Sequence, residues 1–71
     1  MRTDGLTDRE LEVVLLVTQG KTDKAIGRKL GIEARTVRWH VHRIAERWGF
    51  GRDQDTNVRV RIAARGQKLV A

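Results

Sequence analysis

Apolar residues recur every three or four positions over most of this chain, which is the spacing of amphipathic α-helices. The clearest case is residues 34–48. At about 100° per residue, one narrow stripe of this segment is apolar, and it consists of Val37, Val41, Ile44, Ala45 and Trp48. The opposite side is mostly basic and aromatic, and it consists of Arg35, Arg38, Trp39, His42, Arg43 and Glu46. We therefore expect a helix with one buried face and one face suited to an external partner.

A first helix is expected over about residues 7–19. Thr7 and Glu10 have the spacing of a capping box, in which each side chain accepts from the backbone amide of the other residue. Leu6 stands where a hydrophobic staple would close this end. Gly20 suits the left-handed position that ends many helices.

A second helix is expected over about residues 22–30, capped by Thr22 and joined through Gly31 to the helix at 34–48. Gly27 weakens a helix interior by about 1 kcal/mol relative to Ala. We therefore expect Gly27 to permit a close approach to another helix, with simple tolerance of glycine at this position as the alternative. Two short helices joined by a tight turn, the second with a basic outer face, form the helix-turn-helix arrangement.

A fourth helix is expected over about residues 56–65, followed by a C-terminal tail at 66–71. Residues 58–62 alternate with period two and also fit a strand. Gly66 as a stop signal favours the helix, and a lone strand would have no partner.

The fourth helix is apolar on two nearly opposite sides. Val58 and Ile62 occupy the side that we expect to pack inward. The other side remains for a second copy of the chain, and it consists of Val60, Ala63 and Ala64. We therefore expect a homodimer that forms through the C-terminal helix.

The charge balance points to an anionic partner. The chain has 71 residues and a formal net charge of +6, so we expect one small domain over 1–71, with a loose arm at 1–5. Residues 1–19 hold two bases and four acids, whereas residues 20–71 hold thirteen bases and five acids. The positive charge thus lies in the part that contains the basic helix, which favours an anionic partner such as nucleic acid, although a basic surface alone also suits a membrane or an acidic protein.

Other classes of protein fit the composition poorly. The chain has no Cys and two His residues, so we expect no disulfide, no metal site and no cofactor. It also lacks convergent titratable groups and is short for a substrate pocket, so we do not expect an enzyme. No apolar run reaches the roughly 20 residues that span a membrane, and residues 1–12 do not resemble a signal peptide. We expect a cytoplasmic protein with no membrane contact.

Spaced residues over 6–50 carry a resemblance to a known family. They are Leu6-Thr7-x-Arg9-Glu10-x-Glu12-Val13, Gly20-x-Thr22-x-Lys24-x-Ile26, Leu30-x-Ile32, Thr36-Val37-Arg38-x-His40-Val41-x-x-Ile44 and Gly49. In this register the chain resembles the LuxR/GerE-type DNA-binding domain. Three positions depart from the pattern: Glu33 replaces a hydroxyl cap, Trp39 is unusually large, and Trp48 replaces Leu.

The resemblance implies an all-α, four-helix LuxR-type helix-turn-helix domain that binds double-stranded DNA as a dimer and regulates transcription. We expect a stand-alone member without a receiver or sensor domain, acting on the nucleoid and encoded by a bacterium or a phage. The alternative is a helix-turn-helix module for protein interaction, docking on RNA polymerase or on another regulator.

The resemblance also assigns roles on the recognition helix. Arg38, Trp39 and His42 lie at positions that face base edges in this family, and the helical periodicity independently places them outside. Arg38 suits guanine O6 and N7. Trp39 suits a thymine methyl or the sugar-phosphate wall, and alternatively its ring covers a thin core or contacts a protein.

A second set of residues is expected to contact the DNA backbone: Lys21, Thr22, Lys24, Arg35, Thr36, His40 and Arg43. The alternative for Lys24 is that it belongs to an ordinary solvated face and contacts no DNA. His40 fits equally well as a residue at the edge of the core that bonds a backbone carbonyl. Glu46 repels phosphate, so contact should end near its turn.

Overall fold

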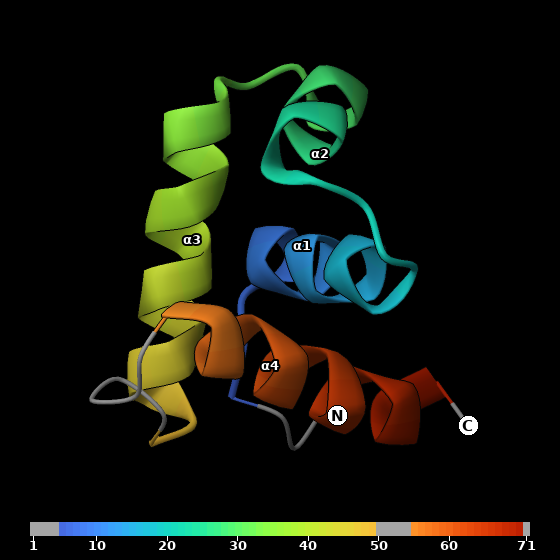
Figure 1. The fold of residues 1–71 in the computed structure, drawn as a ribbon, viewed down its shortest axis with the longest axis vertical. Helices are drawn as coiled ribbons and strands as arrows, with labels where there is room; N and C mark the ends of the chain where they lie inside the picture. The colour runs from blue at the N-terminus through green and yellow to red at the C-terminus, as the bar shows by residue number, and fades with distance from the viewer. Residues whose placement is uncertain (1–4, 50–54, 71) are drawn as a thin grey trace.

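Four helices and no strand make up the part of the chain that the structure describes. This computed structural model describes residues 5–49 and 55–70, without the side chains of residues 55–57 and 70. The helices are α1 (Asp8–Thr18), α2 (Asp23–Leu30), α3 (Ala34–Arg47) and α4 (Asp55–Val70). In Figure 1, α3 stands upright, α2 lies near its upper end, and α1 and α4 cross beside its middle and lower end. The expected all-α fold is confirmed, and the strand alternative for 58–62 is wrong.

The start and end of α1 follow the expected local signals. The Glu10 amide donates to the Thr7 hydroxyl oxygen at 3.1 Å, and the Thr7 amide donates to the Glu10 carboxylate at 3.0 Å, so the capping box is formed. After the helix, Gly20 has a φ of 82°. The Lys21 amide then donates to the Leu16 carbonyl at 3.1 Å. A backbone group therefore provides the hydrogen bond that this carbonyl lacks at the end of the helix, and no side chain is needed.

Glu10 also joins the start of α1 to the end of α3. Its side chain is buried, and Arg47 Nη1 lies 3.2 Å from its Oε1 atom. The same Arg47 nitrogen donates to the Gly5 carbonyl at 2.7 Å. The expected arm at 1–5 lies outside the described residues except for Gly5, whose carbonyl is held by this bond.

The turn between α2 and α3 depends on a missing side chain. Gly31 leaves α2 with a φ of 73°, and the Ile32 amide returns to the Gly27 carbonyl at 2.9 Å. A Cβ at Gly27 would lie 2.5 Å from the Ile32 carbonyl oxygen and 3.3 Å from the Ala34 amide nitrogen. Gly27 therefore permits close approach, as expected, but to the backbone of the turn and the first residue of α3.

The expected end of the fourth helix at Gly66 is wrong. The helix α4 continues to Val70, so the expected tail at 66–71 is helical over the residues described there. Gly66 is buried against α1, and a Cβ would lie 2.8 Å from Val14 Cγ1 and would overlap the Thr18 hydroxyl. Glycine thus allows close packing between two helices, which outweighs its low helix propensity.

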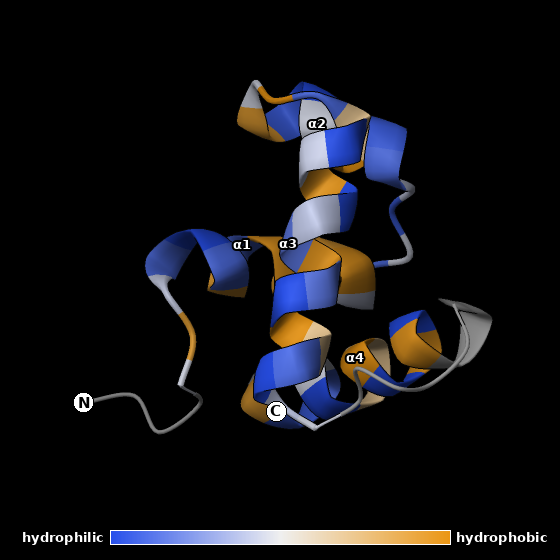
Figure 2. Ribbon diagram, turned by 90° about the vertical axis from the view of Figure 1, so that its left-hand side faces the viewer, coloured by the Kyte–Doolittle hydropathy of each residue, from blue (hydrophilic) through white to orange (hydrophobic). Residues whose placement is uncertain are grey.

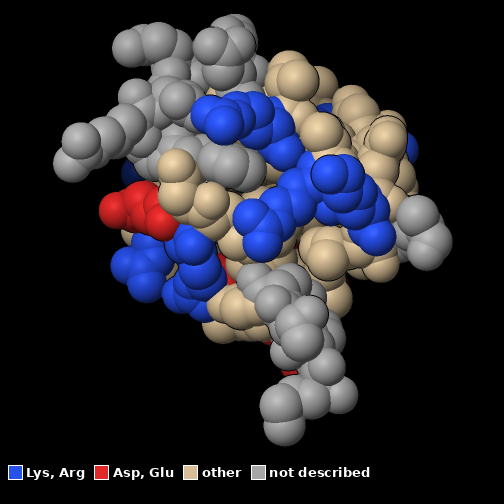
Figure 3. Space-filling view, turned by 90° about the horizontal axis from the view of Figure 1, so that it is seen from below, with Lys and Arg blue, Asp and Glu red and all other residues tan. Residues whose placement is uncertain are grey.

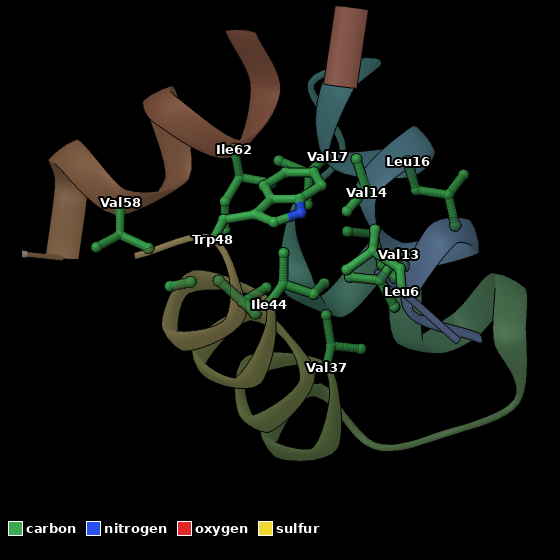
Figure 4. Packing of buried hydrophobic residues seen from close by; sticks show 13 residues of the cluster. Leu6, Val13, Val14, Leu16, Val17, Val37, Ile44, Trp48, Val58 and Ile62 are labelled. Carbon is green, nitrogen blue, oxygen red and sulfur yellow. The ribbon is translucent and has the colours of Figure 1, made fainter. Parts of the chain in front are cut away.

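The core is a single cluster to which all four helices contribute, and α2 supplies the fully buried Ile26. The Trp48 ring lies between Ile62 of α4 and Ile44 of α3, and it points toward α1 (Figure 4). Arg65 covers the outer side of this ring, with its guanidinium carbon 4.4 Å from the ring centroid. The Trp48 ring therefore fills the junction of three helices.

Replacing Gly27 with Ala should destabilise the domain by about 1–3 kcal/mol, because the added Cβ meets backbone that side-chain rotation cannot move. Chemical denaturation followed by circular dichroism would measure the change. Lys29→Ala, at an exposed position of the same helix, is the matched control and should change stability by less than about 0.5 kcal/mol. A Gly27→Ala protein as stable as the original would contradict the packing at the turn.

Candidate nucleic-acid interface

The helix α3 separates its residues into a buried face and an exposed face. Figure 2 looks onto α3 from outside the bundle, and most of the ribbon facing the viewer is blue or pale. The buried residues are Val37, Val41, Ile44 and Ala45. The exposed residues on the outer side include Arg35, Arg38, Trp39, His42 and Arg43, while Thr36 and His40 are half-buried. The residues predicted to face base edges thus lie together on one exposed surface.

Trp39 lies on the surface and does not cover the core. Its side chain is 56% exposed, which is unusual for the largest apolar side chain. Arg43, one turn later, holds its guanidinium carbon 5.4 Å from the Trp39 ring centroid. The His40 ring approaches edge-on, with the two ring centroids 5.0 Å apart. These neighbours orient the indole ring while leaving much of it accessible.

His40 reaches inward with one nitrogen. Its Nδ1 atom is buried and has no hydrogen-bond partner among the described residues. The bond to a backbone carbonyl that the sequence left open for His40 is therefore absent at this nitrogen. With Nδ1 enclosed, Nε2 is the nitrogen that remains for an external contact.

The start of α2 presents the second expected set of residues. Lys21, Thr22 and Lys24 are all exposed, beside the first turn of the helix. The Thr22 hydroxyl accepts from the Ala25 amide at 3.1 Å and keeps its own proton to donate. One exposed segment therefore combines the positive end of the α2 dipole with two lysines, an arrangement that suits an anion.

Asp23 connects this segment to α3 and α4, a role that no sequence signal predicts. Its Oδ1 atom is 2.6 Å from Arg59 Nη1, and its Oδ2 atom is 3.7 Å from Arg38 Nε. Arg59 also donates through Nη2 to the Lys21 carbonyl. The residues Asp23 and Arg59 are far apart in sequence, so no local motif indicates the pair.

Acidic residues near the outer face of α3 are few among the residues described. Glu33 precedes the helix without forming a side-chain cap, and its Oε2 atom lies 2.6 Å from Arg35 Nε. Both side chains are largely exposed, so this ion pair is worth little and can be exchanged for another anion. Glu46 is exposed near the end of α3, where we expect contact to end.

The helix α4 carries an exposed apolar residue beside a basic strip. Val60 is 68% exposed and Ala64 is exposed, whereas Ala63 is half-buried and packs against the core. Two of the three residues expected at a dimer interface are therefore accessible. Seen from below, Lys and Arg side chains gather on the face to which α4 contributes (Figure 3), and its exposed bases are Arg61, Arg65 and Lys68.

Two other kinds of feature are absent from the described residues. No group of three or more His, Asp or Glu side chains there lies close enough together to hold a metal ion. None of the described helices has both the length and the apolar composition needed to cross a membrane.

Comparison with known proteins identifies the class to which this fold belongs. The sequence profile of the bacterial regulatory proteins of the luxR family, also called GerE, matches residues 4–59. The chain therefore belongs to the LuxR family, a family of DNA-binding transcription regulators and not a class of enzymes, and it carries the family's helix-turn-helix domain.

A particular relative supports the same assignment. The chain is 46% identical over 41 residues to the transcriptional regulatory protein LiaR of Bacillus subtilis (strain 168). The match covers 58% of this chain and 19% of LiaR, so the chain spans a small part of that relative's length. No solved structure matches the chain significantly.

Proposed function

We propose that this domain binds double-stranded DNA in a sequence-specific manner, with α3 in the major groove, and thereby regulates transcription. The observation that carries the proposal is the outer face of α3, where cations and rings are exposed in one surface while the opposite face is buried. Helix-turn-helix domains place the second helix of the motif in the major groove. Membership of the LuxR family supports the same partner.

Arg38, Trp39 and His42 are proposed to contact base edges. Arg38 is exposed and lies on the outer side of α3, where it can donate two hydrogen bonds to guanine O6 and N7. Trp39, which contacts Arg43 and His40, offers an apolar surface to a thymine methyl or to the sugar-phosphate wall. His42 can donate to a phosphate or accept from a base edge.

The surrounding polar residues are proposed to fix the position of α3 on the duplex. Contacts to phosphate set orientation and add affinity for every sequence. At the start of α2 the exposed lysines and the Thr22 hydroxyl suit this role, and on α3 His40 would use Nε2. The proposed backbone contacts are Lys21, Thr22, Lys24, Arg35, Thr36, His40 and Arg43.

We propose that α4 joins two copies of the domain. Val60 is a large apolar side chain that faces solvent on a helix whose other side forms part of the core, which supports an interface at Val60, Ala64 and the exposed part of Ala63. A two-fold dimer would place its recognition helices about 34 Å apart, in successive major grooves. Such a dimer would read an inverted repeat.

Binding to random duplex DNA should weaken steeply as salt is added. Neutralising roughly four to six phosphates per monomer gives a slope of log K against log salt of about −4 to −5 per monomer. Fluorescence anisotropy of a labelled duplex at several salt concentrations would measure the slope. No binding at low salt would favour a module for protein interaction, for example with RNA polymerase, and would contradict the proposal.

Arg38→Ala and Lys24→Ala should weaken binding in different ways. Loss of the Arg38 guanidinium should cost about 1–3 kcal/mol, mainly through one base pair of the preferred site. Loss of the Lys24 charge should weaken binding to every sequence alike and flatten the salt slope by about one. The measurement is the affinity for a selected site, its single-base variants and random duplex.

Lys29→Ala is the matched control for Lys24→Ala, because Lys29 is an exposed lysine of the same helix with no proposed DNA contact. Its affinity for all duplexes should stay close to that of the original protein. Equal losses of specific and random binding on replacing Arg38 would show that Arg38 does not read a base.

Val60→Asp should prevent dimer formation without unfolding the domain, because Val60 is 68% exposed and a carboxylate there would be buried only in the dimer. Analytical ultracentrifugation would measure the association, and circular dichroism would check the fold. Lys29→Gln, which changes the net charge by the same amount on α2, should leave association unchanged. Dimers of undiminished affinity in the Val60→Asp protein would place the interface elsewhere.

A further inference from the structure

Asp23 lies at the meeting point of three helices. It occupies the first turn of α2, and its two carboxylate oxygens face different partners. Oδ1 pairs with Arg59 Nη1 of α4 at 2.6 Å, and Oδ2 lies 3.7 Å from Arg38 Nε of α3. The Asp23 side chain is 24% exposed, so water screens these charges less than it screens a fully exposed pair.

Arg59 fixes the orientation of this carboxylate. Its guanidinium donates to Asp23 through Nη1 and to the Lys21 carbonyl through Nη2, so it grips the start of α2 at two points. A planar guanidinium held at two points has a defined direction. Because Oδ1 is engaged by Arg59, Oδ2 is directed toward the outer face of α3.

The pair between Asp23 and Arg38 differs from an ordinary surface ion pair. One partner is anchored by a second helix, whereas Arg38 is the longer and more exposed side chain, with 64% of its side chain accessible. An Arg side chain held in place by an anchored acid loses less conformational entropy when it binds a ligand. The carboxylate lies closest to Nε, which leaves both terminal nitrogens of Arg38 for an external contact.

We propose that Asp23, anchored by Arg59, is a positioning residue that holds Arg38 by Nε so that its two terminal nitrogens meet a guanine end-on. This inference rests on the proposed role of Arg38 in reading a base. Asp23 would contribute to specificity without contacting DNA. The negative charge of Asp23 repels phosphate, so it lowers the affinity for random DNA. By positioning Arg38, the same residue would raise the preference for guanine.

A substitution that removes the charge of Asp23 should therefore change base preference and random-DNA affinity in different ways. Asp23→Asn keeps the size of the side chain and can still accept from Arg59, but it removes the negative charge that attracts the Arg38 guanidinium across 3.7 Å, a distance too long for a hydrogen bond. The expected result is a preference for guanine at the Arg38 base pair that falls by about 3-fold or more from an original value of about 5- to 150-fold. Affinity for random duplex should rise by a small factor or stay the same.

Glu33→Gln is the matched control. Glu33 is also an acid beside the interface and also pairs with an arginine Nε, that of Arg35, at 2.6 Å. Its replacement removes the same charge, so affinity for random duplex should respond similarly. The guanine preference should be unchanged, because Arg35 is proposed to contact only the backbone.

The measurements are anisotropy titrations of the selected site, its variants at the Arg38 base pair and random duplex. They would be made for the original protein, for Asp23→Asn, Glu33→Gln and Arg38→Ala, and for the double variant that combines Asp23→Asn with Arg38→Ala. The double variant should show the same preference as Arg38→Ala alone, because Asp23 acts only through Arg38. In the free protein, the NMR signal of the Arg38 Nε–H group should shift and report greater mobility after the Asp23→Asn substitution.

The outcomes separate the two claims. If Arg38→Ala removes the guanine preference and Asp23→Asn leaves it intact, the positioning role is overturned and the base-reading role stands. If Arg38→Ala leaves every base preference intact, the base-reading role fails and the positioning role fails with it. A purely structural effect of Asp23→Asn would lower the melting temperature and weaken all duplexes alike, which would also overturn the inference.

Discussion

Burial of the apolar stripe of α3 is the constraint on which the rest of the structure depends. Val37, Val41 and Ile44 belong to the core through one side of the helix, and α1, α2 and α4 supply the residues that pack with them. A helix with one side enclosed must present its other side to solvent, so the exposure of the cations and of Trp39 follows from the packing. Two glycines serve the same constraint, since Gly27 admits the backbone of the turn before α3 and Gly66 admits side chains of α1 where a methyl group would be crowded.

Much of this arrangement could be predicted from the sequence because it depends on local signals. The capping box of Thr7 and Glu10, the left-handed glycines after the first two helices and the stripe on α3 each involve residues close together in the chain. The family resemblance extended these signals to the helix-turn-helix fold, which the comparisons confirm. The individual DNA contacts remain predictions, and so does the dimer.

The features that the sequence did not predict depend on contacts between distant segments. Gly66 looks like a stop signal, and only its contact with Val14 and Thr18 of α1 explains why the helix continues through it. Asp23 looks like an acid in the first turn of a helix, and only the fold brings Arg59 to it. Long polar side chains have many rotamers, so their partners are set by tertiary structure and leave no periodic pattern in the sequence.

Arg59 is adjacent in the chain to Val60, and this has a consequence for cooperativity. The side chain that grips the start of α2 and the side chain proposed to meet a second subunit share one turn of α4. If two copies associate as proposed, a shift of α4 that moved Arg59 would act on its partner Asp23, which lies 3.7 Å from Arg38. By thermodynamic linkage, a contact that favours one arrangement of Arg38 would also favour the subunit association compatible with it, so operator sequence and assembly would be coupled in both directions.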